Sequence, residues 1–196
     1  MTTGQHVLFK GEGYWDDVAV LDFKSMYPTI IVGCNISTEN IAIVNLSHTQ
    51  KPAVTWTDSR VLLMHSDVIC SFPRGADGIV PQVMRTLVQT RDKLPKHNPI
   101  NNAYKVGANC LYGAMGFEHS GMYSPLCSVS VTLVVRWCLV ITEVLATRLG
   151  LQVIYGDTDS IMVANTPPGD PRPACVCKVV NMVLGNTFFK AQESFS

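Results

Sequence analysis

The chain carries little charge and no excess of either sign. Of its 196 residues, 15 are Lys or Arg and 15 are Asp or Glu, so the formal net charge is zero. A broad basic surface that attracts nucleic acid by charge alone is therefore not expected. Zinc patterns are missing too, because the seven cysteines form no Cys-x-x-Cys pair and no histidine spacing completes a zinc set. We interpret the seven cysteines, an odd number without such spacing, as reduced, mostly buried thiols in an intracellular protein.

Long uninterrupted apolar runs are also absent. The most apolar stretch, residues 129–149, contains Arg136 and Glu143, and charges at such positions disfavour a membrane span. We expect a buried core helix there and no membrane. Residues 1–13 hold no apolar stretch, so we expect no signal peptide.

Two carboxylates stand between two short apolar segments near the C-terminus. The segments, residues 151–154 and 161–163, favour a β-hairpin with Asp157 and Asp159 at its tip. We assign the chain reversal to Gly156, since glycine tolerates backbone angles that other residues avoid. Acids at i and i+2 of such a tip can share a face, and a divalent cation is the usual remedy for their repulsion. A solvated Asp-rich turn is the alternative interpretation.

A further acid ends another predicted strand. Residues 18–21 are apolar and lead into Asp22, after which residues 23–31 favour the start of a helix. The backbone N–H groups at a helix start bind phosphate well. Carboxylates from two separate strands, together with such an anion site, are the parts of a two-metal phosphoryl-transfer centre.

Two helices are predicted between these acids. Apolar spacing favours one helix over residues 78–94 and a second over residues 100–115. The second helix places Lys105, Asn109 and Tyr112 on one face, at i, i+4 and i+7.

Basic residues gather in this helical pair. Against the single acid Asp92, the stretch contains Arg85, Arg91, Lys93, Lys96 and Lys105. An ordinary solvated helical pair accounts for Lys93 and Lys96, whereas we assign Arg91 and Lys105 to the binding of a polyanion.

Three motifs of the chain resemble those of the family B DNA polymerases, in the family's order. DFKSMYPTII at residues 22–31 resembles Asp-x-x-Ser-Leu-Tyr-Pro-Ser-Ile-Ile, and KVGANCLYG at residues 105–113 resembles Lys-x-x-x-Asn-Ser-x-Tyr-Gly. YGDTDS at residues 155–160 is identical to the third motif. The resemblance runs from about Gly11 to Val163.

The chain departs from the family pattern at three points. Met26 replaces the usual Leu, and Cys110 replaces the usual Ser. Arg91 and Lys105 are only 14 residues apart, so the resemblance implies fingers shorter than in many relatives.

The resemblance implies a metal centre. Asp22 and Asp159 would bridge two Mg²⁺ ions, the carbonyl of Phe23 would add a ligand, and Asp157 would support them. Tyr27 would lie under the sugar and exclude a 2′-hydroxyl, which selects deoxynucleotides.

The resemblance also implies contacts to the incoming nucleotide. The backbone N–H groups of Ser25 and Met26 would hold the β- and γ-phosphates. The triphosphate would further meet Arg91, Lys105 and Asn109. Tyr112 and Gly113 would pack against the nascent base pair, although Tyr112 could also serve as a core aromatic.

The implied fold is α+β: a polymerase palm with an antiparallel sheet and packed helices, plus a short two-helix fingers insertion. Residues 1–77 would form the first part of the palm, residues 78–116 the fingers, and residues 117–196 the second part of the palm. We expect the exonuclease and thumb to be absent. Residues 54–56 and 61–64 predict a further hairpin, and residues 71–79 a loop into the fingers.

The implied function is that of a DNA-directed DNA polymerase catalytic fragment, acting in DNA replication. The alternative is a non-catalytic remnant or split subunit that retains nucleotide or DNA binding. Expected partners are primer-template DNA, deoxynucleoside triphosphates, the remaining polymerase domains and a processivity factor. The short fingers and the divergent first and second motifs favour a large DNA virus of a herpesvirus-like kind as the source. This implies an intracellular location, in the host nucleus for a herpesvirus-like virus.

Overall fold

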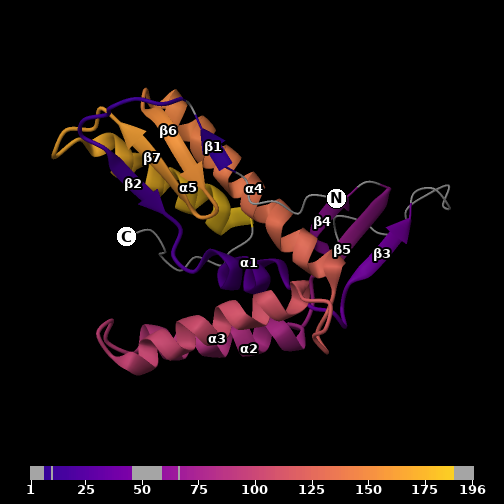
Figure 1. Ribbon diagram of the computed structural model, residues 1–196. Helices are drawn as coiled ribbons and strands as arrows, with labels where there is room; N and C mark the ends of the chain where they lie inside the picture. The colour runs from indigo at the N-terminus through magenta and orange to yellow at the C-terminus, as the bar shows by residue number, and fades with distance from the viewer. Residues whose placement is uncertain (1–6, 10, 46–58, 66, 188–196) are drawn as a thin grey trace. The chain divides into compact units, whose positions relative to one another are not determined.

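The computed structural model describes residues 7–9, 11–45, 59–65 and 67–187. The chain divides into two compact units, which are described one at a time. The first unit combines residues 1–26 with residues 134–196, and the second spans residues 27–133. Helices and antiparallel strands occur in both (Figure 1), so the predicted α+β class is confirmed.

A four-stranded antiparallel sheet forms the centre of the first unit. Its strands lie in the order β1-β6-β7-β2, with the bounds Val7–Phe9 for β1, Gln152–Asp157 for β6, Ser160–Ala164 for β7 and Ala19–Asp22 for β2. The predicted hairpin is thus β6–β7, and the predicted strand before Asp22 is β2. Strand β1, which has no strong alternation in sequence, adds to the outer edge of β6.

One face of this sheet is buried. Leu21, Val153, Ile161 and Val163 are nearly inaccessible to solvent, and helix α5 (Pro171–Thr187) contacts β2. In Figure 1 this helix and the second half of α4 (Pro125–Arg148) lie behind the sheet. The other face is open, since Val20 is 53% exposed. This one-sided burial follows from the period of two in a strand.

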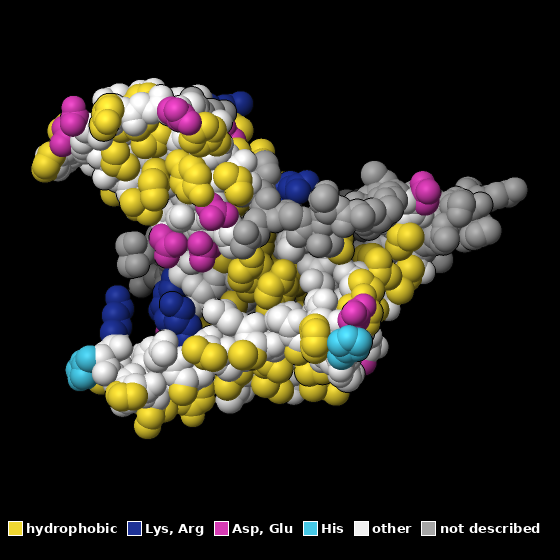
Figure 2. Space-filling model, viewed as in Figure 1, with side chains coloured by type: hydrophobic (Ala, Val, Ile, Leu, Met, Phe, Trp, Pro, Cys, Tyr) yellow, Lys and Arg dark blue, Asp and Glu magenta, His cyan; other side chains and the backbone are white. Residues whose placement is uncertain are grey.

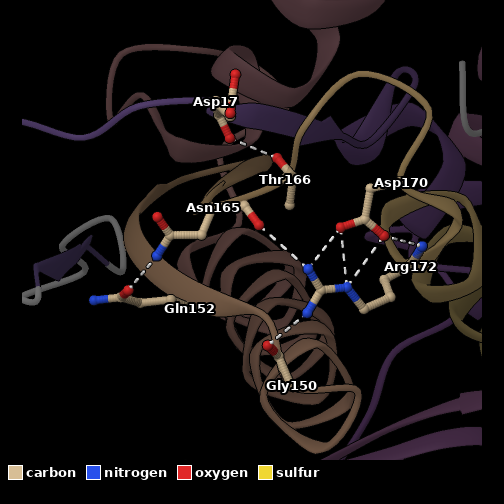
Figure 3. A network of polar contacts seen from close by, with 7 residues as sticks. All are labelled: Asp17, Gly150, Gln152, Asn165, Thr166, Asp170 and Arg172. Atoms are coloured by element: carbon tan, nitrogen blue, oxygen red, sulfur yellow. Dashed lines mark hydrogen bonds and ion pairs between the residues drawn. The ribbon is translucent and has the colours of Figure 1, made fainter.

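A polar network joins the segments that lead into and out of the first unit's helices (Figure 3). Arg172 donates to the backbone oxygen of Gly150 at 3.0 Å, to that of Asn165 at 3.2 Å, and to both oxygens of Asp170. Thr166 donates from its backbone N–H and its hydroxyl to the backbone oxygen of Asp17. The ends of α4 and β7 and the start of α5 are thereby tied together.

The second unit contains α1, a three-stranded sheet, a helical pair and residues 125–133 of α4. Helix α1 spans Met26–Cys34, and the antiparallel sheet has the order β3-β5-β4. Its strands are β3 (Ala42–Asn45), β5 (Val68–Pro73) and β4 (Ser59–His65).

The prediction for this sheet was wrong in part. Residues 54–56 lie outside the described residues, and residues 61–64 do belong to a strand, β4. That strand pairs with β5, which occupies residues 71–73 of the predicted loop. A loop was predicted over residues 71–79, but Ser71 and Phe72 are both buried in the sheet, so tertiary burial overrides local propensity.

The predicted helical pair is confirmed. Helix α2 spans Ile79–Asp92 and α3 spans Pro99–Gly116, and they contact each other along their length (Figure 1). Asn98 caps α3 by accepting from the N–H of Ile100, and Pro99 occupies the first turn, where a missing N–H costs nothing. The division into two units does not test the predicted palm and fingers boundaries, which stay predictions.

Helix α4 is the apolar stretch singled out in the sequence. In the described part of the chain it alone is long and apolar enough to cross a membrane, judged by length and composition. A buried core helix passes the same test, and one side of α4 is inaccessible to solvent. This side includes Val131, Val134, Cys138 and Leu139.

Candidate active site

Two acidic side chains flank one residue at the end of the first unit's sheet. In the register of the strands, Asp22 of β2 and Asp157 of β6 are both partners of Ser160 on β7, which runs between them. Direct cross-strand partners point to the same face. Two strand spacings separate the backbones of Asp22 and Asp157 by roughly 10 Å. Asp22, Ser160 and Asp157 therefore form one row across the sheet. This row alternates with the buried row that contains Leu21 and Ile161, so it lies on the open face.

The third acid lies in the tight turn of the hairpin. Asp159 follows Thr158, whose φ of 54° is rare for a β-branched residue. The Thr158 hydroxyl donates to the Asp157 carboxylate at 2.8 Å, and the N–H of Phe23 donates to the backbone oxygen of Asp159, also at 2.8 Å. The hairpin tip is therefore tied to the end of β2, and strain is held at a position that carries acids.

The role assigned to Gly156 was wrong. The chain reverses at Thr158 and Asp159, while Gly156 lies inside β6. A Cβ at Gly156 would stand 3.1 Å from Leu8 Cδ1, 3.2 Å from Ile161 Cγ2 and 3.3 Å from the Ser160 backbone oxygen. Glycine is needed here for room between neighbouring strands and not for a positive φ.

The donor set at this sheet end suits a hard cation. Carboxylates and a backbone carbonyl are the oxygen ligands of Mg²⁺, which usually takes only one or two protein carboxylates and completes its shell with water and phosphate. In the described part of the chain, no group of three or more His, Cys, Asp or Glu side chains has the geometry of a closed metal site. An open site of few protein ligands is the arrangement these residues fit.

Helix α1 begins directly after this acidic end. Ser25 has a φ of 53° and precedes Met26, the first helical residue, which is 4% exposed. A left-handed residue followed by a helix start turns successive N–H groups toward one side, a geometry that favours anions. Ser25 and Met26 belong to the first unit, and Tyr27 begins the second.

Aromatic residues of two motifs meet in the second unit. The rings of Tyr27 on α1 and Tyr112 on α3 stack, with centroids 4.3 Å apart and planes 18° apart. Burial raises the pKa of the Tyr112 hydroxyl, against the effect of its hydrogen bond with Ser128. Both rings are partly accessible. The core role considered for Tyr112 is thus true in part, and its ring also backs Tyr27.

Lys105 lies on one side of α3, and Arg91 contacts that side from α2. Lys105 and Asn109 are exposed, one turn apart, with Tyr112 following on the same face. Arg91 lies in the last turn of α2, where its Nε donates to Asn101 Oδ1 at 3.3 Å. Asn101 precedes Lys105 by one turn, so the contact joins Arg91 to the Lys105 face.

Apolar side chains occupy other parts of the same pair (Figure 2). Ile79, Val83, Ile100 and Val106 are each more than 40% exposed. The pair is therefore not a uniformly solvated basic hairpin.

Comparison with known proteins decides the family. The model of DNA polymerase family B matches residues 3–170 of this chain. The chain belongs to DNA polymerase family B.

Relatives of this family B segment come from archaea and eukaryotes. It is 32% identical over 178 residues to DNA polymerase 2 of Aeropyrum pernix, covering 84% of this chain and 21% of that protein. It is 33% identical over 178 residues to the DNA polymerase alpha catalytic subunit of Xenopus laevis, covering 82% of this chain and 11% of that protein. The chain thus spans about a fifth or less of the length of these curated relatives.

A solved structure agrees with the assignment. The family B DNA polymerase from Pyrobaculum calidifontis superposes with a TM-score of 0.61 and 26% identity, covering 95% of this chain and 24% of that one. The likeness extends over both units of this family B segment.

Sequence reasoning missed two residues that support the site, Asn101 and Ser128. Asn101 donates to the backbone oxygens of Arg91 and Leu94, and so closes the end of α2. Its place one turn before Lys105 was a signal that could have found it. Ser128, the partner of Tyr112, lies outside every motif and gave no signal in this family B sequence.

Proposed function

We propose that this chain is the catalytic segment of a DNA-directed DNA polymerase, which adds deoxynucleotides to a primer 3′-hydroxyl by two-metal-ion phosphoryl transfer. The observation that supports it most is the register of β2, β7 and β6, with Asp22 and Asp157 opposite the same Ser160. Residues far apart in sequence are thus brought to one sheet end, and these are the acids that the motif resemblance assigns to the metal ions.

The carboxylates are proposed to hold two Mg²⁺ ions. Asp22 and Asp159 would hold the ions, the Phe23 carbonyl would add a ligand, and Asp157 would act as a supporting ligand. When bound, the ions lower the pKa of the primer hydroxyl and neutralise the departing pyrophosphate. The hydrogen bond from Phe23 N–H to the Asp159 backbone oxygen holds the two ligand segments in register.

The remaining residues are proposed to bind the nucleotide. The N–H groups of Ser25 and Met26 hold its β- and γ-phosphates. Arg91, Lys105 and Asn109 also bind the triphosphate. Tyr27, backed by the Tyr112 ring, excludes a ribose 2′-hydroxyl. Tyr112 and Gly113 pack against the nascent base pair.

The proposed partners follow from this chemistry. They are primer-template DNA and deoxynucleoside triphosphates, with the further polymerase domains and a processivity factor acting alongside this segment. A viral source, and with it a host-nuclear location for a herpesvirus-like virus, is proposed from the short connection between α2 and α3.

Primer extension by a chimera tests the proposal. The sequence replaces the matching segment of the Pyrobaculum calidifontis polymerase, and extension is measured with Mg²⁺ and all four deoxynucleotides. We expect the chimera to extend the primer. Asp22→Asn or Asp159→Asn should lower the extension rate on the order of a thousandfold, because each variant loses a ligand of ions that stabilise the transition state by roughly several kcal/mol.

The alternative gives a different result. A folded chimera that binds primer-template but does not extend it identifies the chain as a non-catalytic remnant that retains binding. Near-normal extension by either Asn variant overturns the assignment of the metal ligands.

A further inference from the structure

The first turn of α2 is capped by side chains from a distant segment. Its N-cap residue, Gly78, has no side chain to offer, so the N–H groups of the first turn need other acceptors. Asn35 Oδ1 accepts from Gly78 N–H at 2.8 Å, Glu39 Oε1 accepts from Ile79 N–H, and Ser37 Oγ accepts from Val80 N–H at 3.2 Å. Three consecutive N–H groups are thus satisfied from about 40 residues upstream.

The three acceptors form a connected cluster, which we call the α2 clamp: Asn35, Ser37 and Glu39. The Ser37 hydroxyl donates to Glu39 Oε2, and Asn35 Nδ2 donates to the backbone oxygens of Pro73 at 3.1 Å and Ala76 at 3.2 Å. Asn35 and Ser37 are completely buried. Glu39 is exposed, but each of the three side chains makes a second hydrogen bond that restrains it.

The packing at Gly78 shows how closely the clamp approaches α2. A Cβ at this position would stand 2.6 Å from Ser37 Cβ, 2.7 Å from Asn40 Nδ2 and 2.8 Å from Glu39 Oε1. Only glycine leaves room for these side chains to reach the backbone. The lack of a side chain at the N-cap is therefore what allows the distant acceptors to reach the N–H groups of α2.

The charge of the clamp matches the helix. Glu39 lies at the positive end of the α2 dipole, where a carboxylate is favoured. Burial raises the pKa of Glu39, but the hydrogen bonds from Ser37 and Ile79 outweigh it and hold this pKa below its ordinary value. Glu39 is therefore ionised at neutral pH.

The clamp connects two helices that carry predicted nucleotide contacts. Asn35 follows α1 directly, has a φ of 58°, and lets Ile36 N–H return to the Ile31 backbone oxygen, an arrangement that ends a helix. Helix α1 carries Tyr27, and α2 carries Arg91 in its last turn. One residue therefore ends the first helix and caps the second.

We propose that Asn35, Ser37 and Glu39 are positioning residues that fix α2 against the end of α1, and so hold Arg91 in place for the nucleotide triphosphate. This inference rests on the proposed function, since it assigns Arg91 to the triphosphate. A helix of 14 residues is a stiff rod of about 20 Å, so a small tilt at its capped end displaces Arg91 at the other. Loss of the clamp would therefore displace Arg91, although the clamp lies at the opposite end of α2.

Single-nucleotide incorporation by the chimeric polymerase tests the clamp. Glu39→Ala removes an acceptor, Glu39→Gln keeps an oxygen for Ile79 N–H, and Glu118→Ala is the matched control, an acid whose side chain is 72% exposed. We expect Glu39→Ala to raise KM for the deoxynucleotide about fivefold with a smaller change in kcat, which is the size of effect of a lost cap. Glu39→Gln is expected to restore most of the affinity, and the control to leave KM unchanged.

A double-mutant cycle separates positioning from general loosening. If Glu39 acts through Arg91, Glu39→Ala raises KM in the parent chimera but adds nothing once Arg91→Ala is present. An equal effect in both backgrounds, or an unchanged KM in Glu39→Ala, overturns the inference. Ser37→Ala, which removes a single hydroxyl, provides the same comparison if Glu39→Ala does not fold.

Failure of the proposed function is distinct from failure of the clamp. A parent chimera that incorporates no nucleotide contradicts the polymerase assignment. An active parent whose KM is insensitive to Glu39 contradicts the clamp alone.

Discussion

At the scale of single residues, the site depends on small side chains that leave room for others. Gly156 gives space to Leu8 and Ile161, and Gly78 gives space to the α2 clamp. Neither glycine has the positive φ that glycine is usually invoked to explain. These two glycines therefore serve close approach between elements.

A substitution at Gly156 tests this directly. Gly156→Ala places a methyl group 3.1–3.3 Å from three neighbours on β1 and β7, so we expect a loss of about 1–3 kcal/mol in the free energy of unfolding. Gly185→Ala, on α5 with nothing within 4 Å, is the control and should gain about 0.5–1 kcal/mol. Urea unfolding of the two variants measures both, and equal effects contradict the role given to Gly156.

The stacked pair of Tyr27 and Tyr112 gives a second prediction at this scale. Tyr27→Ala removes the ring that the proposal places under the sugar, and we expect ribonucleotide incorporation by the chimera to rise at least about tenfold. Tyr27→Phe keeps the stack on Tyr112 and should keep the discrimination. Competitive incorporation of matched ribo- and deoxynucleotides decides this, and unchanged selectivity in Tyr27→Ala removes the residue from that role.

At the scale of elements, the helices and the acidic strands could be predicted from the sequence. Apolar spacing located α2 and α3, and the short apolar runs located β2, β6 and β7. These patterns are local, so one chain segment contains all the information. The three acids were found for the same reason, because each ends or follows a recognisable strand.

Elements stabilised by distant partners could not be predicted in this way. Strand β5 contains Ser71 and Pro73, and its burial against β3 and β4 is what makes it a strand. The α2 clamp joins residues 35–39 to residues 78–80, and no periodicity reports such a pairing. The role of Gly156 was missed likewise, since the neighbours that crowd it lie on other strands.

The polar network at the start of α5 makes a prediction about pH (Figure 3). Hydrogen bonds from Arg172 hold the pKa of Asp170 below its ordinary value. A carboxyl with a depressed folded-state pKa stabilises the fold above its unfolded-state pKa, near 4, and this contribution is lost as the pH falls through the folded-state value. We expect the unfolding free energy of Asp170→Asn to depend less on pH below about 5 than that of the parent chain. Parallel curves from urea unfolding across this range contradict the assignment.

At the scale of the whole molecule, the chain is one segment of a much longer enzyme type. It covers 21% of the Aeropyrum pernix relative and 24% of the Pyrobaculum calidifontis structure. The balanced charge of the sequence is consistent with the proposal that further polymerase domains act alongside this segment, because such a segment would need no broad basic surface of its own.

The cysteines report on the integrity of the whole fold. Burial raises the pKa of Cys138 to about 12, whereas Cys110 and Cys175 are exposed. Because the thiolate is the reactive form, iodoacetamide at pH 8 should modify Cys110 and Cys175 within minutes and leave Cys138 intact until the chain unfolds. Mass spectrometry of the labelled peptides measures this, and early labelling of Cys138 contradicts the burial of α4.

The central claim is that the acids at the end of the β2–β7–β6 sheet hold catalytic metal ions. The most direct measurement is Mn²⁺ binding by electron paramagnetic resonance, with Mn²⁺ in place of Mg²⁺ and primer-template and nucleotide present. Asp22→Asn and Asp159→Asn are compared in the chimera with Asp16→Asn, an exposed acid outside the row. We predict that the parent and Asp16→Asn bind Mn²⁺ and that the other two variants lose most of this binding. Undiminished Mn²⁺ binding by Asp22→Asn and Asp159→Asn would contradict the account.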